Sequence, residues 1–165
     1  MGHGGATVFW STRVREIISV EHDTEWFGLA SKAITALGEG QTQPTLKLCV
    51  PDPAEAPAYA SGRQEYSAQS LETYVKAIDD FPTAYFDLVV VDGRARMACL
   101  RKSVERVAPG GVVLLDNSDY ARYQAELERI WAEYQQTFER QDFLSPTPFA
   151  ANIGSQITIF TRKAM

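Results

Sequence analysis

Acidic side chains stand at the ends of three apolar segments of this chain. Glu21, Asp92 and Asp116 each follow directly on a run rich in apolar and β-branched residues, and Asn117 follows Asp116. Carboxylates at such positions can accept hydrogen bonds from sugar hydroxyls or bind hard cations such as Mg²⁺. Because the carboxyl ends of parallel strands meet at one edge of a sheet, these acids are expected to converge on a polar site. Asp and Asn also begin turns and cap helices, so a purely structural role stays open.

A glycine-rich turn at the start of the chain indicates a nucleotide-type cofactor. Gly2, His3 and Gly4 precede a helix predicted over residues 7–13. Glycines allow the backbone to come close to a ligand, and the first N–H groups of the following helix point toward it. Glu21 then comes about where nucleotide-binding folds place the carboxylate that holds ribose hydroxyls.

Helix and strand patterns alternate through most of the 165 residues. Helical spacing of apolar residues predicts helices over residues 23–37, 71–78, 97–107 and 123–134, and apolar runs predict strands over 16–21, 46–50, 86–92, 112–116 and 157–160. Residues 138–144 carry no clear pattern. The alternation predicts a single α/β domain over residues 1–165, Rossmann-like and doubly wound, with a mostly parallel sheet and helices on both faces. The continuous apolar run before Asp92 predicts a strand buried on both faces.

Composition narrows the range of partners. The formal net charge is -5, and no block rich in Lys and Arg stands out, which argues against nucleic acid as a partner. No apolar run approaches the length of a membrane span, so no membrane partner is expected. Cys49 and Cys99 are predicted to be reduced, packed thiols, which fits a cytoplasmic location.

Together these segments resemble the class I S-adenosylmethionine-dependent methyltransferases, and the resemblance covers nearly the whole chain. It rests on the glycine turn, on Glu21, on the strand 86–92, and on the Pro-Gly-Gly turn that precedes the strand 112–116. The resemblance implies that S-adenosylmethionine is the cofactor and that Glu21 accepts hydrogen bonds from its ribose. The other cofactor-binding residues that it implies are Gly2, His3, Gly4, His22 and Asp92.

A narrower similarity concerns the metal-dependent O-methyltransferases that act on catechols and caffeoyl-CoA. In that group an Asp after the fourth strand and an Asp-Asn pair after the fifth hold a divalent metal, and Asp92, Asp116 and Asn117 are the matching residue types. This similarity implies Mg²⁺ or another divalent cation that binds and activates a substrate hydroxyl. Arg94 and Arg96 allow another interpretation, in which arginines neutralise these carboxylates or bind an anionic substrate.

The function expected from these features is methyl transfer from S-adenosylmethionine to a small-molecule acceptor at oxygen, with Asp92, Asp116 and Asn117 as the catalytic residues. One alternative is a non-catalytic or truncated methyltransferase-like domain that acts in an assembly. Another is a nicotinamide-dependent enzyme, because a glycine turn and a strand-end acid also suit dinucleotides.

The resemblance also implies a first strand that ends in the glycine turn, and the sequence has no residues before Met1 to form it. The chain is therefore expected to be N-terminally truncated relative to the family. Either the second and fourth family strands pair directly, or a strand of a partner completes the sheet, as in a homo-oligomer, because unpaired buried backbone groups are costly.

Overall fold

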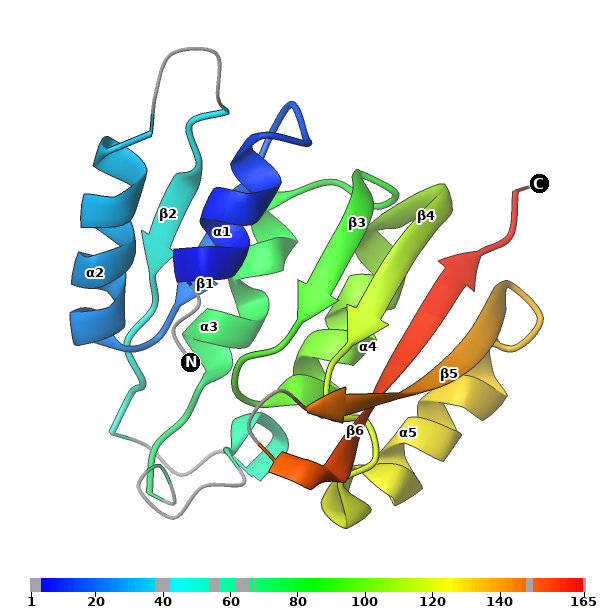
Figure 1. The fold of residues 1–165 in the computed structure, drawn as a ribbon. Helices are drawn as coiled ribbons and strands as arrows, with labels where there is room; N and C mark the ends of the chain where they lie inside the picture. The colour runs from blue at the N-terminus through cyan, green and yellow to red at the C-terminus, as the bar shows by residue number, and fades with distance from the viewer. Residues whose placement is uncertain are drawn as a thin grey trace. The chain divides into compact units, whose positions relative to one another are not determined.

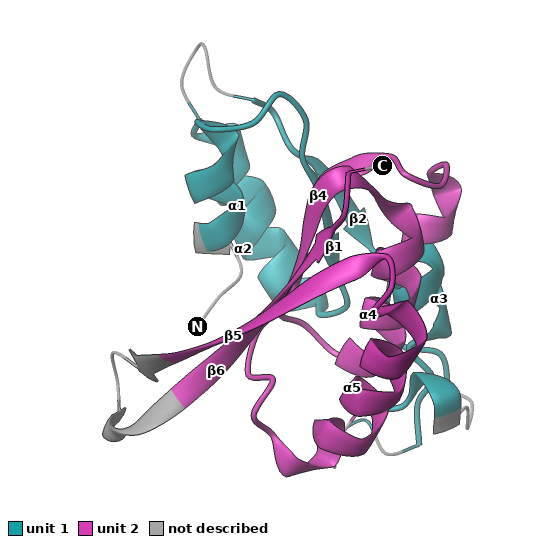
Figure 2. Ribbon diagram, turned by 90° about the vertical axis from the view of Figure 1, so that its right-hand side faces the viewer, with its two compact units in different colours: residues 1–60, 65–77 teal, residues 61–64, 78–165 magenta. Residues whose placement is uncertain are grey.

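Helices and strands alternate along the chain, and the predicted α/β class is confirmed (Figure 1). The computed structural model describes residues 4–37, 42–53, 57–61, 66, 68–147 and 150–164. The chain forms two compact units, residues 1–60 with 65–77 and residues 61–64 with 78–165 (Figure 2). Each unit has a sheet of its own. The single domain over residues 1–165 stays a prediction.

The first unit contains a two-stranded parallel sheet. In it β1 (Ile18–Glu21) pairs with β2 (Thr45–Leu48), and Glu21 at the end of β1 lies opposite Leu48. The helical segments of this unit are α1 (Gly4–Ser11), α2 (Thr24–Thr35), the short 3₁₀ helix Pro57–Tyr59 and α3 (Glu72–Lys76). β1 ends at Glu21 and α2 begins at Thr24, so the first of the three strand-end acids lies at the short turn between this strand and this helix.

Asp23 begins α2 as its N-cap. Its carboxylate accepts hydrogen bonds from the backbone N–H groups of Glu25 and Trp26, at 2.8 and 2.9 Å. An Asp in this position satisfies amide groups that the first turn of a helix leaves without partners. The helix start predicted at residue 23 is therefore confirmed, and the cap fixes the short turn between Glu21 and α2.

The second unit contains a four-stranded sheet in the order β3-β4-β6-β5. Strands β3 (Phe86–Val91) and β4 (Val107–Leu115) are parallel, whereas β6 (Ala150–Arg162) runs antiparallel to β4 and to β5 (Phe138–Thr147). The 3₁₀ helix Ala77–Asp80 precedes β3, α4 (Arg96–Arg106) connects β3 to β4, and α5 (Ala121–Tyr134) follows β4.

Apolar side chains from the sheet, α4 and α5 form one core in the second unit. Fully burying a side chain of this kind contributes about 1.5–3 kcal/mol to stability. The two helices also contact each other. The buried core residues are Val91, Leu100, Val104, Val107, Val113, Leu115, Leu127, Ile130, Phe138 and Phe160.

The burial of β3 differs from the prediction. Val91 is buried and Val89 packs against the core, but Val90 between them is 43% exposed. Since neighbouring residues of a strand point to opposite faces, the face of β3 opposite Val91 is not buried at Val90. The prediction of a strand buried on both faces is therefore wrong for β3, although its position and type are confirmed.

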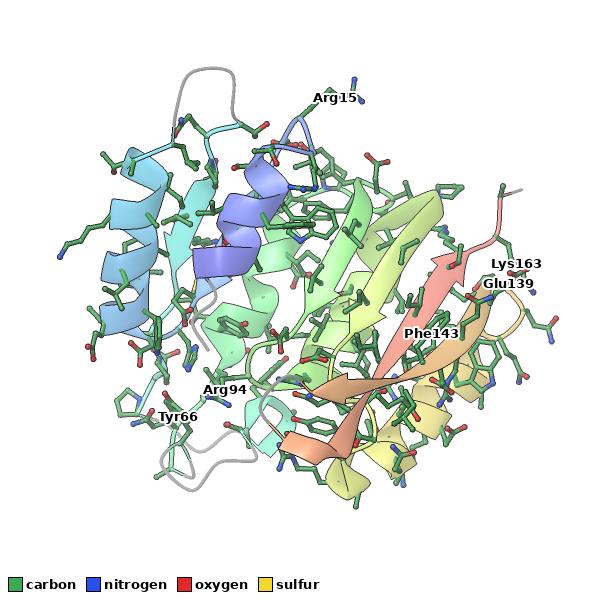
Figure 3. All side chains as sticks on the ribbon, in the orientation of Figure 1. Arg15, Tyr66, Arg94, Glu139, Phe143 and Lys163 are labelled. Atoms are coloured by element: carbon green, nitrogen blue, oxygen red, sulfur yellow. The ribbon has the colours of Figure 1, made fainter. Side chains whose placement is uncertain are left out.

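Strand β5 is the element that the sequence did not predict. Its polar residues interrupt the apolar pattern, but its backbone pairs with β6 from Phe138 opposite Arg162 onward. Arg140 of β5 forms ion pairs with Glu128 and Asp142, at 2.7 and 3.2 Å. Phe143, on the same strand, is 48% exposed (Figure 3).

Within the described residues, β1 pairs with β2 in the first unit, and β3 pairs with β4 in the second. Direct pairing of the second and fourth family strands and completion of the sheet by a partner strand both stay predictions.

Two expectations from composition can also be compared with the structure. Cys49 and Cys99 are both free thiols, as predicted. In the described part of the chain, no helix has the length and apolar character needed to cross a membrane.

Candidate functional site

In the first unit, Glu21 forms a tight hydrogen-bonded turn with the two residues that follow it. Its Oε1 accepts hydrogen bonds from the backbone N–H groups of His22 and Asp23, at 2.7 and 3.0 Å, and lies 2.8 Å from Nδ1 of His22. All of these contacts reach the same oxygen. Oε2 receives no hydrogen bond from the described residues and is therefore the oxygen that could accept one from a ligand.

The Glu21 carboxyl is held as an anion. Burial alone would raise its pKa, but the hydrogen bonds from the His22 ring and from the backbone N–H groups of Asp23 and His22 lower the pKa to about 2. The side chain thus carries a full negative charge at neutral pH while it is only 9% exposed. A buried, oriented carboxylate of this kind is suited to binding neutral hydroxyl groups.

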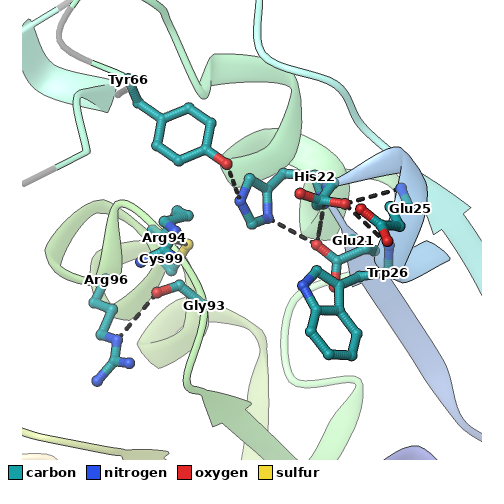
Figure 4. Close-up of polar contacts among 10 residues, drawn as sticks. Glu21, His22, Glu25, Trp26, Tyr66, Gly93, Arg94, Arg96 and Cys99 are labelled. Atoms are coloured by element: carbon teal, nitrogen blue, oxygen red, sulfur yellow. Dashed lines mark hydrogen bonds and ion pairs between the residues drawn. The ribbon is translucent and has the colours of Figure 1, made fainter. Parts of the chain in front are cut away.

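Two tyrosines surround the His22 ring. Nε2 of His22 lies 3.1 Å from the hydroxyl of Tyr66, and the rings of Tyr66 and Tyr74 both meet the His22 ring edge to face. Figure 4 shows the resulting chain of contacts from the Tyr66 hydroxyl through the His22 ring to the Glu21 carboxylate. These contacts fix the orientation of the ring, so His22 also supports the position of Glu21.

The glycine turn cannot be compared with the prediction in full. Gly2 and His3 lie outside the described residues, and Gly4 is the first residue of α1. The helix expected behind the turn is present, with bounds Gly4–Ser11. The role of these three residues in cofactor binding stays a prediction.

In the second unit, Arg96 lies among the residues predicted to be catalytic. Its guanidinium has five N–H donors, and the structure gives five hydrogen bonds from them. Nη2 donates to the backbone carbonyl and to Oδ1 of Asp92, at 3.0 and 2.9 Å. Nη1 donates to the carbonyl of Asp116 and to Oδ1 of Asn117, at 2.5 and 2.7 Å. Nε donates to the Gly93 carbonyl at 3.1 Å, the bond drawn in Figure 4. Arg96 therefore ties together the segments that follow β3 and β4.

Two residues next to Arg96, one in sequence and one in space, have left-handed backbone conformations. Ala95, just before Arg96, has φ 44°, and Asn117 has φ 50°. Such left-handed conformations cost free energy in residues other than glycine and often occur at functional sites. The Asn117 side chain is fixed as well, because its Nδ2 donates to the hydroxyl of Ser155 at 2.6 Å while its Oδ1 accepts from Arg96.

Asp92 and Asp116 form a carboxyl pair. Burial, side-chain hydrogen bonding with Asp92 and the negative charge of Asp92 together raise the pKa of Asp116 to about 6, against the opposing effects of Asn117 and Arg96. Asp116 can therefore hold or release a proton close to neutral pH.

The predicted metal ligands do not fit a metal site in this arrangement. Oδ1 of Asp92 and Oδ1 of Asn117 both accept hydrogen bonds from Arg96, and the Asp116 carboxyl is hydrogen-bonded to Asp92. Among the described residues, no three His, Cys, Asp or Glu side chains are grouped so that they could hold a metal ion. For Arg96 the alternative interpretation, neutralisation of the carboxylates, is confirmed by its 2.9 Å ion pair with Asp92.

Three residues that contact His22 or Asn117 were not predicted from the sequence to belong to a site. Tyr66 comes from a long connection, Tyr74 from a short helix and Ser155 from the last strand, so each is distant in sequence from the residue it contacts. No rule of sequence spacing predicts their contacts with His22 or Asn117. These contacts depend on the tertiary fold.

Solved structures of methyltransferases share this fold. An rRNA methylase from Streptococcus thermophilus superposes with a TM-score of 0.63 at 15% identity, covering 99% of this chain and 82% of that one. The N-methyltransferase NodS from Bradyrhizobium japonicum, in complex with S-adenosyl-L-homocysteine, gives a TM-score of 0.56 at 11% identity, with coverages of 96% and 72%. The O-methyltransferase from Bacillus cereus, in complex with SAH (S-adenosylhomocysteine), gives 0.57 at 11% identity, with coverages of 90% and 63%.

The chain has the fold of the class I methyltransferases. No protein-family model matches the sequence, and a comparison with curated proteins gave no significant match. At such low identity the likeness concerns the fold, and the acceptors named for the three structures differ from one another. The Rossmann-like class predicted from the sequence is confirmed by this likeness.

Proposed function

We propose that this chain transfers a methyl group from S-adenosylmethionine to an oxygen atom of a small-molecule acceptor. The observation that supports this most is the Asp92–Asp116 carboxyl pair, fixed by Arg96 directly after β3 and β4 in a methyltransferase fold. In open α/β sheets, ligands bind outside the carboxyl ends of the strands. A proton-accepting group in that position suits the deprotonation of an acceptor hydroxyl.

The cofactor would be held in part by Glu21. Its carboxylate is ionised and anchored through Oε1, so Oε2 can accept a hydrogen bond from a ribose hydroxyl without moving. S-adenosylmethionine, when bound, supplies an electrophilic methyl group. Further contacts are proposed for Gly2, His3, Gly4, His22 and Asp92, as the family resemblance implies.

Asp116 would act as the proton acceptor of the reaction. Its pKa of about 6 leaves a large fraction of carboxylate at neutral pH, which can accept the proton of an acceptor hydroxyl as that oxygen is methylated. Asn117, held from both sides by Arg96 and Ser155, would orient the acceptor through its fixed amide. No divalent metal is needed for these roles.

An assay of methyl transfer to a panel of hydroxylated small molecules tests this proposal. Asp116→Asn removes the proton acceptor but keeps the size of the side chain, and we expect the rate to fall by about 100-fold or more. Asp119→Asn, in an exposed position of the same turn, is the matched control and should keep the wild-type rate. An unchanged rate in Asp116→Asn would contradict the assigned role, and methylation of RNA alone would contradict the small-molecule acceptor.

A second candidate function is a non-catalytic role in an assembly. The observation in its favour is that the first unit's sheet has only the two strands β1 and β2 within the described residues. This alternative predicts a folded protein that transfers no methyl group to any acceptor and that associates with itself or with a partner in light-scattering measurements. A nicotinamide-dependent enzyme is the third candidate, and binding of NAD in place of S-adenosylhomocysteine would support it.

A further inference from the structure

The cluster around Arg96 uses an arginine where its oxygen atoms would otherwise suit a metal ion. We infer that the Arg96 guanidinium is the resident cation of this site, that the wild-type site therefore excludes divalent metal, and that a neutral residue at position 96 converts it into a metal-binding site. This inference does not depend on methyl transfer, because it concerns only which cation the cluster accepts.

The first argument is that every N–H group of the Arg96 guanidinium has a hydrogen-bond acceptor. Arg96 is only 9% exposed, and each of its five N–H groups is matched by a hydrogen bond to an oxygen. Three of the acceptors are backbone carbonyls and two are side-chain oxygens, of Asp92 and Asn117. Carboxylate, amide and carbonyl oxygens are also the ligands that Mg²⁺, Mn²⁺ and Ca²⁺ prefer. Without Arg96, these oxygens would form a set suited to a hard cation.

The second argument is that Arg96 stands where a helix ordinarily disfavours a positive charge. It is the first residue of α4, whose N-cap, Ala95, makes no side-chain capping hydrogen bond and has a left-handed conformation. No acidic residue lies in the first turn of α4. The N-terminal end of a helix carries a partial positive charge, which is unfavourable for an arginine. The pairing of Arg96 with Asp92 and the carbonyl oxygens offsets these costs.

The third argument is the electrostatic repulsion between the Arg96 guanidinium and a divalent ion. A divalent ion bound to Oδ1 of Asp92 and Oδ1 of Asn117 would lie in the position of the guanidinium and be repelled by it. Arg96 would have to leave a nearly fully buried position for the metal to enter. The same oxygens therefore bind one cation or the other, and the covalently attached one is always present.

Binding of Mn²⁺, followed by electron paramagnetic resonance and calorimetry, tests the inference. Wild-type protein should show no saturable binding. Arg96→Gln, which removes the charge, should bind Mn²⁺ at least roughly tenfold more tightly than the wild type, as expected when one unit charge is removed beside a divalent ion. Asp92→Asn added to Arg96→Gln removes a carboxylate of the proposed ligand set and should reduce this binding again. Arg96→Lys keeps the charge and should behave like the wild type.

Saturable Mn²⁺ binding by the wild type that Asp92→Asn abolishes would overturn the inference, and so would a folded Arg96→Gln protein that binds no Mn²⁺. If Arg96→Gln does not fold, the inference is tested by measuring the thermal unfolding temperature of the wild-type protein with and without Mn²⁺. An unfolding temperature unchanged by Mn²⁺ supports the inference, and an increase that Asp92→Asn abolishes contradicts it.

Discussion

Glu21 combines a structural role with the cofactor-binding role proposed for it. One carboxylate oxygen closes the turn between β1 and α2 through two backbone N–H groups, and the same oxygen contacts the His22 ring. The other oxygen receives no hydrogen bond from the described residues. Binding a ligand at Glu21 would therefore leave the turn intact.

The lowered pKa of Glu21 gives a prediction about acid stability. Because the pKa falls from 4.5 to about 2 on folding, the ionised side chain should contribute roughly 3 kcal/mol to the free energy of unfolding above pH 4.5. This contribution should disappear as the pH falls from about 4.5 toward about 2. In Glu21→Gln it should be absent at all pH values, as measured by denaturant unfolding at a series of pH values. Glu25→Gln, at an exposed position nearby, is the control, and an acid profile of Glu21→Gln identical to that of the wild type would show that the carboxylate is not stabilised in this way.

The sequence predicts which residues lie around Arg96, but not which cation they bind. Asp92, Asp116 and Asn117 were expected because strand-end acids converge when strands are parallel, and Arg96 was recognised as a candidate for neutralising them. The choice between arginine and metal depends on whether the Arg96 side chain turns back toward β3 and β4. Arg96 follows the left-handed Ala95, a conformation that no sequence rule predicts.

At the scale of elements, the Pro-Gly-Gly segment within β4 is tightly constrained. Gly110 has φ +79°, which L-residues with side chains rarely adopt. Gly111 has no space for a side chain, because a Cβ there would lie 2.8 Å from Cγ1 of Val107 and 2.9 Å from the backbone oxygen of Asp87. Glycine is therefore favoured at position 110 by the backbone conformation and required at position 111 by close packing between β3 and β4.

Replacing Gly111 by alanine should destabilise the second unit. The backbone oxygen of Asp87 cannot move without disturbing β3, so we expect a loss of about 1–3 kcal/mol in the free energy of unfolding, measured with chemical denaturant. Gly28→Ala is the matched control, because nothing lies within 4 Å of a Cβ at Gly28 in α2. Alanine in a helix should be more stable than glycine by about 0.5–1 kcal/mol. Equal stability of Gly111→Ala and the wild type would mean that this contact is looser than described.

The elements predicted from the sequence are those whose periodicity is strong. The helices around Leu100 and Leu127 and the strands around Val89 and Val113 are confirmed, with ends that differ by a few residues. Strand β5 was missed because its residues 139–142 are polar, and its strand conformation depends on pairing with β6 rather than on a local pattern. Long-range pairing of this kind is invisible to periodicity.

At the scale of the whole molecule, the fold alone does not decide the acceptor. Similar structures include an rRNA methylase, an O-methyltransferase and an N-methyltransferase. One fold can support many acceptors because specificity resides in site residues and loops. The net charge of -5 favours a small molecule over RNA as the acceptor proposed for this chain.

Titration calorimetry with S-adenosylhomocysteine tests the central proposal most directly, with NAD as the comparison ligand and Glu21→Ala as the control variant. We predict saturable binding of S-adenosylhomocysteine, no binding of NAD, and affinity about 30-fold lower in Glu21→Ala, which corresponds to roughly 2 kcal/mol for the lost charge-assisted hydrogen bond. Binding of NAD instead, or no binding of S-adenosylhomocysteine to the folded wild-type protein, would contradict the proposed function.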